Sequence, residues 1–348
     1  MRTRAVTLAL LAPLALSLAA CGKNDKPVTT ANGSPAAESA TTLKLGYFPN
    51  LTHATAIVGV EKGIFAKDLG QDTLKTATFN AGSAAVEALF AGAVDATFVG
   101  PNPAINAWAK SKAIKIISGA TAGGAALVVK PEITSAADLK GKKLATPQLG
   151  NTQDVALRSY LKDNGLSTDT SGGGDVHILP QENSATLDAF KAGTIDGAWV
   201  PEPWATRLVQ DGGGKILVNE ASLWPGGKFV TTQLVVTTKF LDKHPGAVKR
   251  LLEGVVEAND FVNANAAEAQ TVVNAGIKKI TGKSLKDAVI QAAWKNLAFT
   301  VDPISTSLTT SKEHAVALGL LKAVDLSGIY DLDPLNAILK AAGKPGVQ

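Results

Sequence analysis

An internal repeat constrains the fold of this chain more than any other feature of its sequence. Residues 83–99 read SAAVEALFAGAVDATFV, and residues 184–200 read SATLDAFKAGTIDGAWV. The two copies align with each other without a gap. Each copy is followed by a Pro-x-Pro sequence, at 101–103 and at 201–203. A repeat of this length predicts two structural units of the same kind.

Each copy predicts a helix, a buried strand and the start of a second helix. Ser83 and Ser184 are the expected N-cap residues, because a serine hydroxyl accepts from an N–H of the first helical turn. Gly92 and Gly193 are the expected left-handed helix ends. The apolar run after each glycine predicts a buried strand, and Pro-x-Pro suits the first turn of the next helix.

This order places a helix N-terminus at the carboxyl end of each strand, the edge where open α/β sheets bind ligands. The similarity continues outside the repeat, since residues 61–64 (EKGI) and 163–166 (DNGL) also correspond. The predicted fold class is therefore α/β, with two Rossmann-like lobes joined by two crossover strands and a ligand cleft between the lobes. The alternative is that both copies are βα units of one larger sheet.

The run FVTTQLVVTT at 229–238 has no helical period and predicts a strand that crosses back to the first lobe, paired with residues 125–130. The predicted domains are accordingly 43–128 plus 236–348 for lobe I and 129–235 for lobe II. Alanine-rich helices that would cover the sheet of lobe I are expected near 245–264, 266–280, 284–298 and 309–321.

Residues 1–21 have the pattern of a targeting segment, with two arginines before an apolar run that is short for a membrane span. The sequence LAAC at 18–21 resembles a bacterial lipobox, which implies cleavage before Cys21 and its lipidation. An ordinary signal peptide with an incidental cysteine is the alternative. Residues 22–42 are small and polar and predict a disordered tether. We expect an exported protein, lipid-anchored to the outer face of the bacterial cytoplasmic membrane.

Composition limits the chemistry of the chain. Cys21 is the single cysteine, and the four histidines have no metal-ligand spacing, so the sequence predicts no intrachain disulfide, no metal site and no cofactor. The net charge of +4 falls by two without Arg2 and Arg4. No basic stripe is present, so nucleic acid is not an expected partner. We expect a monomer.

Four stretches carry a family resemblance: LKLGYFPNLTHA at 43–54, FNAGSAAVEALFAGAVDATFVGPNPA at 79–104, SAADLKGKKLATPQLGNTQDVALRSYL at 135–161 and KAGTIDGAWVPEPWATRL at 191–208. They resemble solute-binding proteins of ABC importers, in the branch that serves aliphatic sulfonates, taurine, nitrate, bicarbonate and thiamin-pyrimidine precursors. The resemblance runs from residue 43 to the C-terminus. It implies a type II periplasmic binding-protein fold, a small-molecule ligand, and a permease with its ATPase as partners.

Two other classes of function are alternatives. Fungal thiamin-pyrimidine synthases resemble the same fold, but they depend on a cysteine-rich motif that a chain with one cysteine lacks. No Ser-His-Asp arrangement, phosphate-binding loop or metal set appears, so we expect no enzymatic activity. A lipoprotein receptor or adhesin without a role in transport is the second alternative.

The predicted cleft combines helix N-termini with neutral polar side chains. Unpaired N–H groups and the helix dipole favour an anion there. A sulfonate has a spread charge and three acceptor oxygens, and we expect an aliphatic sulfonate such as an alkanesulfonate or taurine. No arginine occupies these positions, so a doubly charged phosphate fits less well. The predicted ligand-binding residues are Asn50, Thr52, His53, Ser83, Asn102, Asn151, Thr152, Gln153, Trp199, Glu202 and Trp204.

The sequence leaves the roles of three of these residues undecided. Trp199 ends a strand and belongs either to the core or to the pocket, whereas Trp204 is the better candidate for an aromatic contact. Glu202 would repel an anion. It binds an amine on the ligand, pairs across the cleft to hold the closed form, or interacts with Arg207.

Overall fold

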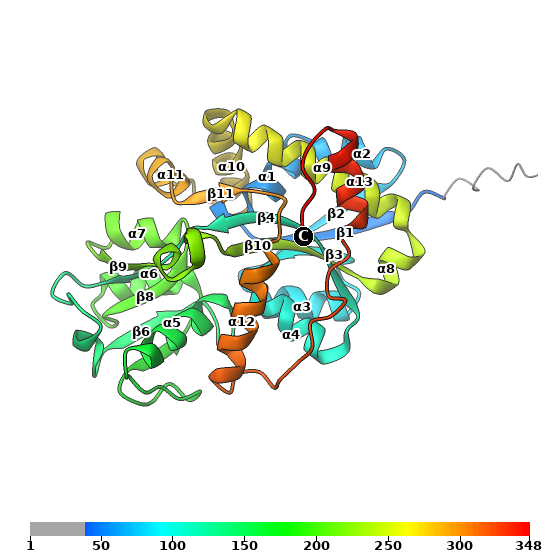
Figure 1. Ribbon diagram of the computed structural model, residues 1–348. Helices are drawn as coiled ribbons and strands as arrows, with labels where there is room; N and C mark the ends of the chain where they lie inside the picture. Colours follow the sequence, from blue (N-terminus) through cyan, green and yellow to red (C-terminus); the bar gives the residue numbers. More distant parts are fainter. Residues whose placement is uncertain (1–38) are drawn as a thin grey trace, which may run out of the picture. The chain divides into compact units, whose positions relative to one another are not determined.

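The computed structural model describes residues 39–348, which contain two β-sheets with helices on both faces (Figure 1). The predicted targeting segment, Cys21 and most of the predicted tether lie outside these residues. The tether prediction extends too far, because the first strand begins at Thr42 and the Thr41 N–H donates to Asp72 (2.9 Å). The first sheet consists of β1 (Thr42–Tyr47), β2 (Thr73–Thr78), β3 (Ala96–Val99), β4 (Ile114–Gly123), β10 (Val230–Thr237) and β11 (Leu297–Phe299). The second consists of β5 (Ala125–Val129), β6 (Lys143–Thr146), β7 (His177–Pro180), β8 (Gly197–Pro201) and β9 (Lys215–Asn219).

The two sheets are built on the same plan. In the first, β1 lies parallel to β2 and β3, and β10 runs antiparallel between β3 and β4. In the second, β6 lies parallel to β7 and β8, and β5 runs antiparallel between β8 and β9. The two-lobe prediction is confirmed, and one larger sheet is excluded for residues 39–348.

The predicted pairing of residues 229–238 with 125–130 is wrong. The two runs form β10 and β5, which occupy equivalent places in different sheets. Both strands are buried along nearly their whole length. A continuous apolar run predicts a buried strand but does not specify its neighbours.

The sheets also move the predicted lobe boundaries of 128/129 and 235/236. Strand β5 belongs to the second sheet and β10 to the first, so the chain leaves lobe I at Gly123-Gly124 and returns between β9 and β10. Both glycines have a φ of 74°, a backbone conformation that favours glycine. We refer below to the part with the first sheet as lobe I and to residues 125–219 as lobe II.

Helices cover both faces of each sheet (Figure 1). Helix α12 also packs against α4 of lobe I and α5 of lobe II. No helix within residues 39–348 combines the length and the apolar character needed to cross a membrane. The helices are α1 (Ala54–Glu61), α2 (Ile64–Leu69), α3 (Gly82–Phe90), α4 (Pro101–Ser111), α5 (Thr152–Asp163), α6 (Asn183–Lys191), α7 (Trp204–Gln210), α8 (Thr238–Lys243), α9 (Pro245–Ala264), α10 (Ala266–Thr281), α11 (Asp287–Trp294), α12 (Ser305–Ala317) and α13 (Asp333–Ala341).

The repeat forms equivalent elements in the two lobes, with α3 and β3 in one and α6 and β8 in the other. Gly92 and Gly193 have φ values of 69° and 73°, as predicted for left-handed helix ends. The serine N-caps are wrong, because α3 and α6 start two residues earlier than predicted and their N-cap residues are Ala81 and Glu182. Pro101 begins α4 as expected, whereas α7 begins only at Trp204, after the second Pro-x-Pro.

The segment that returns from lobe II to lobe I is anchored by a buried carboxylate. Glu220 accepts hydrogen bonds from the indole N–H groups of Trp199 (2.6 Å) and Trp224 (3.3 Å). Trp224 stacks on Phe229 with a ring separation of 5.4 Å. Burial raises the pKa of Glu220 from 4.5 to about 7, and the two indole N–H groups oppose this shift.

We predict that Glu220 makes the protein less stable as pH rises from 4.5 to 7. In this window the folded state keeps a proton on Glu220 that the unfolded state releases, so the free energy of unfolding falls, by roughly 3 kcal/mol in total. Glu220→Gln removes this titration and still accepts from an indole N–H. Thermal unfolding should show the variant gaining on the wild type between pH 4.5 and pH 8. Glu132→Gln, at an exposed position, is the control, and a parallel pH profile for Glu220→Gln would contradict the prediction.

Candidate functional site

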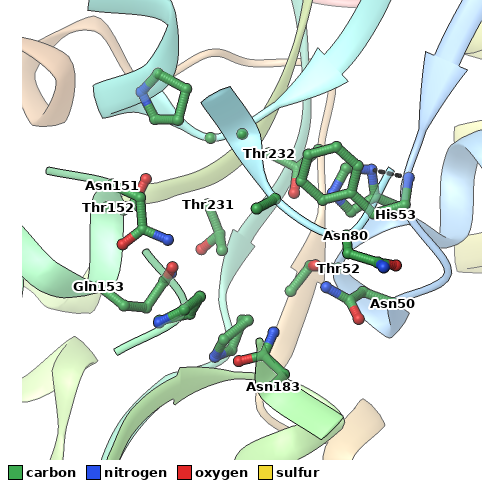
Figure 2. Close-up of a pocket in the computed structure, with 17 residues that line it drawn as sticks. Asn50, Thr52, His53, Asn80, Asn151, Thr152, Gln153, Asn183, Thr231 and Thr232 are labelled. Atoms are coloured by element: carbon green, nitrogen blue, oxygen red, sulfur yellow. Dashed lines mark hydrogen bonds between the residues drawn. The ribbon is translucent and has the colours of Figure 1, made fainter. Parts of the chain in front are cut away.

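A polar cavity lies between the carboxyl ends of the parallel strands of the two lobes (Figure 2). The cavity has a volume of about 40 Å³. Both lobes contribute to its wall, and so does β10. The lining residues are Phe48, Asn50, Thr52, His53, Asn80, Ala81, Gly82, Gly100, Pro103, Pro147, Asn151, Thr152, Gln153, Asn183, Pro201, Thr231 and Thr232.

The starts of five helical segments meet at this cavity. They belong to the turn Leu51–His53 that leads into α1, and to α3, α4, α5 and α6. The first N–H groups of a helix have no acceptor within that helix. The aligned peptide dipoles add a partial positive charge at each start. The cavity wall is therefore electropositive without a cationic side chain.

His53 is a neutral part of the wall. It is 3% exposed, and its ring stacks on Phe48 with centroids 4.4 Å apart. Its Nδ1 accepts from the backbone N–H of Phe48 (3.3 Å), so the ring proton is on Nε2. Burial lowers the pKa of His53 to about 3. Consequently, none of the lining side chains is charged near neutral pH.

A buried ion pair holds the loop between β6 and α5. This loop and the first two residues of α5 carry the lining residues Pro147, Asn151, Thr152 and Gln153. The Asp154 carboxylate accepts from the Arg158 Nε, the Gly150 N–H and the Thr146 hydroxyl, at 2.9, 2.8 and 2.9 Å. The Asp154 and Arg158 side chains are 0% and 2% exposed. The Asn151 side chain caps α5 by accepting from the Asp154 N–H (3.0 Å).

Of the eleven predicted ligand-binding residues, the structure places six in the cavity wall: Asn50, Thr52, His53, Asn151, Thr152 and Gln153. The remaining five lie elsewhere. Trp199 belongs to the core of lobe II, where it bonds Glu220. Asn102 is buried and donates to the Ser311 carbonyl of α12 (3.3 Å). Ser83 is covered by Gln148, whose amide donates to its hydroxyl.

Trp204 and Glu202 join the lobes instead of lining the cavity. The Trp204 indole N–H donates to the Asn50 side-chain oxygen (3.0 Å), and Arg207 lies over the Trp204 ring. Glu202 is 1% exposed and accepts from the Asn296 amide of lobe I (2.7 Å) and from the Thr206 hydroxyl (2.9 Å). Burial raises the pKa of Glu202. Of its three predicted roles, the cross-lobe contact is the one present, whereas Arg207 pairs with Asp211 (3.5 Å).

Several wall residues were missed from the sequence. Asn80 lies in the loop between β2 and α3, and Asn183 is the first residue of α6, but neither is among the eleven predicted ligand contacts. Phe48, which directly follows β1, is not among the predicted contacts either. Thr231 and Thr232 lie on β10, and the sequence FVTTQL at 229–234 gave no indication that this strand would reach the cavity. Within residues 39–348, no group of three or more histidine, cysteine, aspartate or glutamate residues is placed to hold a metal ion.

Two α/β lobes with a polar cavity at their strand ends define the periplasmic binding-protein fold. The chain belongs to the NMT1-like family, whose model matches residues 36–276. It is 31% identical over 231 residues to a binding protein of Brucella abortus (strain 2308), covering 65% of this chain and 69% of that protein. It is 30% identical over 203 residues to the taurine-binding periplasmic protein of Escherichia coli (strain K12), covering 58% and 61%.

The fold is shared with the alkanesulfonate-binding protein of Xanthomonas axonopodis pv. citri, solved with bound MOPS. The TM-score is 0.70 at 20% identity, and the match covers 83% of this chain and 96% of that one. The predicted fold class and family are therefore confirmed.

Breaking the Asp154–Arg158 pair should destabilise the protein strongly. Asp154→Asn leaves a buried guanidinium without its counter-ion, which typically costs about 3–5 kcal/mol. Glu253→Gln is the matched control, because Lys249 and Glu253 form an ion pair with the same spacing on an exposed helix face, where such pairs contribute about 0.3–0.5 kcal/mol. Urea unfolding measures both losses. Equal losses for the two variants would show that the buried pair does not hold this loop.

Proposed function

We propose that this chain is the extracytoplasmic solute-binding component of an ABC importer. It captures a small organic oxyanion in the cavity by lobe closure and delivers it to a permease that works with its ATPase. The ligand is an aliphatic sulfonate, such as an alkanesulfonate or taurine. The family membership and the similarity to a taurine-binding protein and an alkanesulfonate-binding fold support this proposal.

One observation carries the choice of an anion: five helix starts surround a cavity whose lining side chains are all uncharged. Free N–H groups and helix dipoles attract a negative charge. Threonine hydroxyls and asparagine and glutamine amides add donors of adjustable orientation. With no cation to balance a second charge, the site suits a singly charged oxyanion, and a sulfonate is ionised throughout the physiological pH range.

The contacts between the lobes support a closing motion. Trp204 bonds Asn50 and Glu202 bonds Asn296, both across the lobes. Rotation of lobe II about the Gly123-Gly124 connection would break the Trp204–Asn50 bond and open the cavity, as in the hinge motions of other two-lobe proteins. The Glu202–Asn296 bond lies beside this connection. Ligand binding then favours the arrangement in which both lobes supply donors.

A second candidate is nitrate or bicarbonate in the same importer role. The small cavity favours it, because a volume of about 40 Å³ corresponds to roughly three water-sized groups. The pyrimidine alternative loses its expected stacking partner, since Trp204 does not line the cavity. We propose no enzymatic activity for this chain, neither that of a pyrimidine synthase nor any other.

The N-terminal residues and the oligomeric state are also part of the proposed function. We infer export, cleavage before Cys21 and attachment of a lipid to this residue, with the described residues acting as a monomer outside the cytoplasmic membrane. Mass spectrometry of the membrane-extracted protein tests the lipid directly.

Isothermal titration with methanesulfonate, taurine, nitrate, bicarbonate and hydroxymethylpyrimidine tests the ligand. A sulfonate at a hundredfold excess over its Kd should also stabilise the fold by about 2.7 kcal/mol. Binding of nitrate or bicarbonate without the sulfonates would replace the ligand but keep the importer role. Binding of none of these solutes would contradict the proposed function.

Thr152→Val should weaken binding about 10- to 100-fold, because a hydrogen bond to a charged group contributes about 1.5–3 kcal/mol. Thr152 is 7% exposed, lines the cavity, and is replaced by a side chain of similar shape. Thr309→Val, at an exposed position of α12, is the control. If Thr152→Val binds the ligand with unchanged affinity, the Thr152 hydroxyl does not contact the ligand.

A further inference from the structure

Gln148 of lobe II occupies the start of a helix in lobe I. Its Oε1 accepts from the backbone N–H of Ser83 (3.2 Å), and its Nε2 donates to the Ser83 hydroxyl. Ser83 is the second residue of α3, so this N–H has no acceptor within its own helix. One amide group therefore satisfies both polar groups of Ser83 at once.

This Ser83–Gln148 bridge lies at the edge of the cavity. Ala81 and Gly82 line the cavity on one side of the cleft and Pro147 on the other, but Ser83 and Gln148 do not. Both bridging residues are partly exposed to solvent. The bridge thus separates the cavity from the solvent between α3 and the loop before α5.

The equivalent helix start in lobe II has no such cover. Asn183 corresponds to Gly82 in the repeat, and it lines the cavity directly. Its side-chain oxygen is buried without a hydrogen-bond partner within the part of the chain that the structure describes. Among the described residues, the α6 side of the wall therefore has an unpaired acceptor, whereas on the α3 side Gln148 bonds the N–H and hydroxyl of Ser83.

The volume of the cavity limits the size of a ligand that it can enclose. The cavity volume of about 40 Å³ leaves space for the head of an oxyanion, at roughly 10–15 Å³ for each water-sized group. A chain attached to this head has to leave through the wall. The residue after Gln148 is Leu149, an apolar side chain that is 46% exposed.

We propose that Gln148 is a specificity-determining residue that, by bonding Ser83 across the cleft, excludes oxyanions with a long aliphatic chain. This inference rests on the proposed function, because it assumes an oxyanion in the cavity. Removal of the Gln148 side chain opens the wall beside α3 and frees the Ser83 N–H and hydroxyl for the ligand.

The test compares the affinities of two ligands, methanesulfonate and butanesulfonate, by isothermal titration. Gln148→Ala should improve the affinity for butanesulfonate relative to methanesulfonate at least tenfold over the wild type. Gln148→Ser, which shortens the side chain but keeps it polar, should change this ratio in the same direction and serves if the alanine variant does not fold. Circular dichroism verifies the fold of each variant.

Gln210→Ala is the matched control, because Gln210 of α7 also donates across the lobes, to the Ala288 carbonyl (3.4 Å), without bordering the cavity. It should leave the ratio unchanged. A loss of affinity in Gln148→Ala that is equal for both sulfonates would mean that the bridge only holds the lobes together, and it would overturn the inference.

The two proposals fail in different ways. Wild-type binding of both sulfonates, with the same affinity ratio in Gln148→Ala, overturns the role of Gln148 and leaves the proposed function intact. Binding of butanesulfonate by Gln148→Ala alone supports the role of Gln148. If neither protein binds any anion of the panel, both the role of Gln148 and the proposed function are overturned.

Discussion

The structure depends on one electrostatic constraint, the unpaired N–H groups at the helix starts that face the cavity. A buried N–H without an acceptor costs free energy comparable to a lost hydrogen bond. When the lobes are apart, water accepts from these groups. Bringing the lobes together removes water, so an acceptor must replace it. For Ser83 of α3 the acceptor is Gln148, for Asp154 of α5 it is Asn151, and for the remaining N–H groups that face the cavity we expect the ligand. Binding and closure are thereby coupled through the same hydrogen bonds.

The lobes position these helix starts through a shared plan of strands. In each sheet three parallel strands end at the cavity, and each is followed by a turn into a helix. Buried hydrogen bonds support this edge, such as those that the Asp154 carboxylate accepts from Arg158 and Gly150. They lie one layer behind the lining residues. A cavity that relies on backbone donors requires this support, because backbone groups cannot adjust by rotamer changes.

The sequence predicted the elements whose signals are local. The repeat located α3, β3, α6 and β8, because the spacing of apolar residues and the glycine stops belong to each segment alone. It did not predict the partners of β10, which depend on residues more than a hundred positions away. The prediction for Ser83 was wrong because α3 starts two residues earlier than expected, so that Ser83 is not the cap but a helix residue bonded from the other lobe.

The candidate site was predicted where a polar residue lies in the turn between a strand and the helical segment that follows it, as for Asn50 and Asn151. It was missed where a side chain reaches the cavity from a strand, as for Thr232 on β10. Trp204 and Glu202 were expected to contact the ligand, but in the structure they bond Asn50 and Asn296, which are brought close only by the packing of the two lobes. Distances of this kind are not encoded in the spacing of residues along the chain.

The position of β10 has a consequence for the order in which the chain can fold. Lobe II is one continuous segment, so all of its strands are available once residue 219 has been made. The sheet of lobe I lacks its central strand until residues 230–237 arrive, and β10 then has to insert between β3 and β4, which were synthesised much earlier. Closing so long a loop is slow relative to local pairing. Until β10 is available, β3 and β4 therefore each have an unpaired edge, whereas lobe II can already be complete.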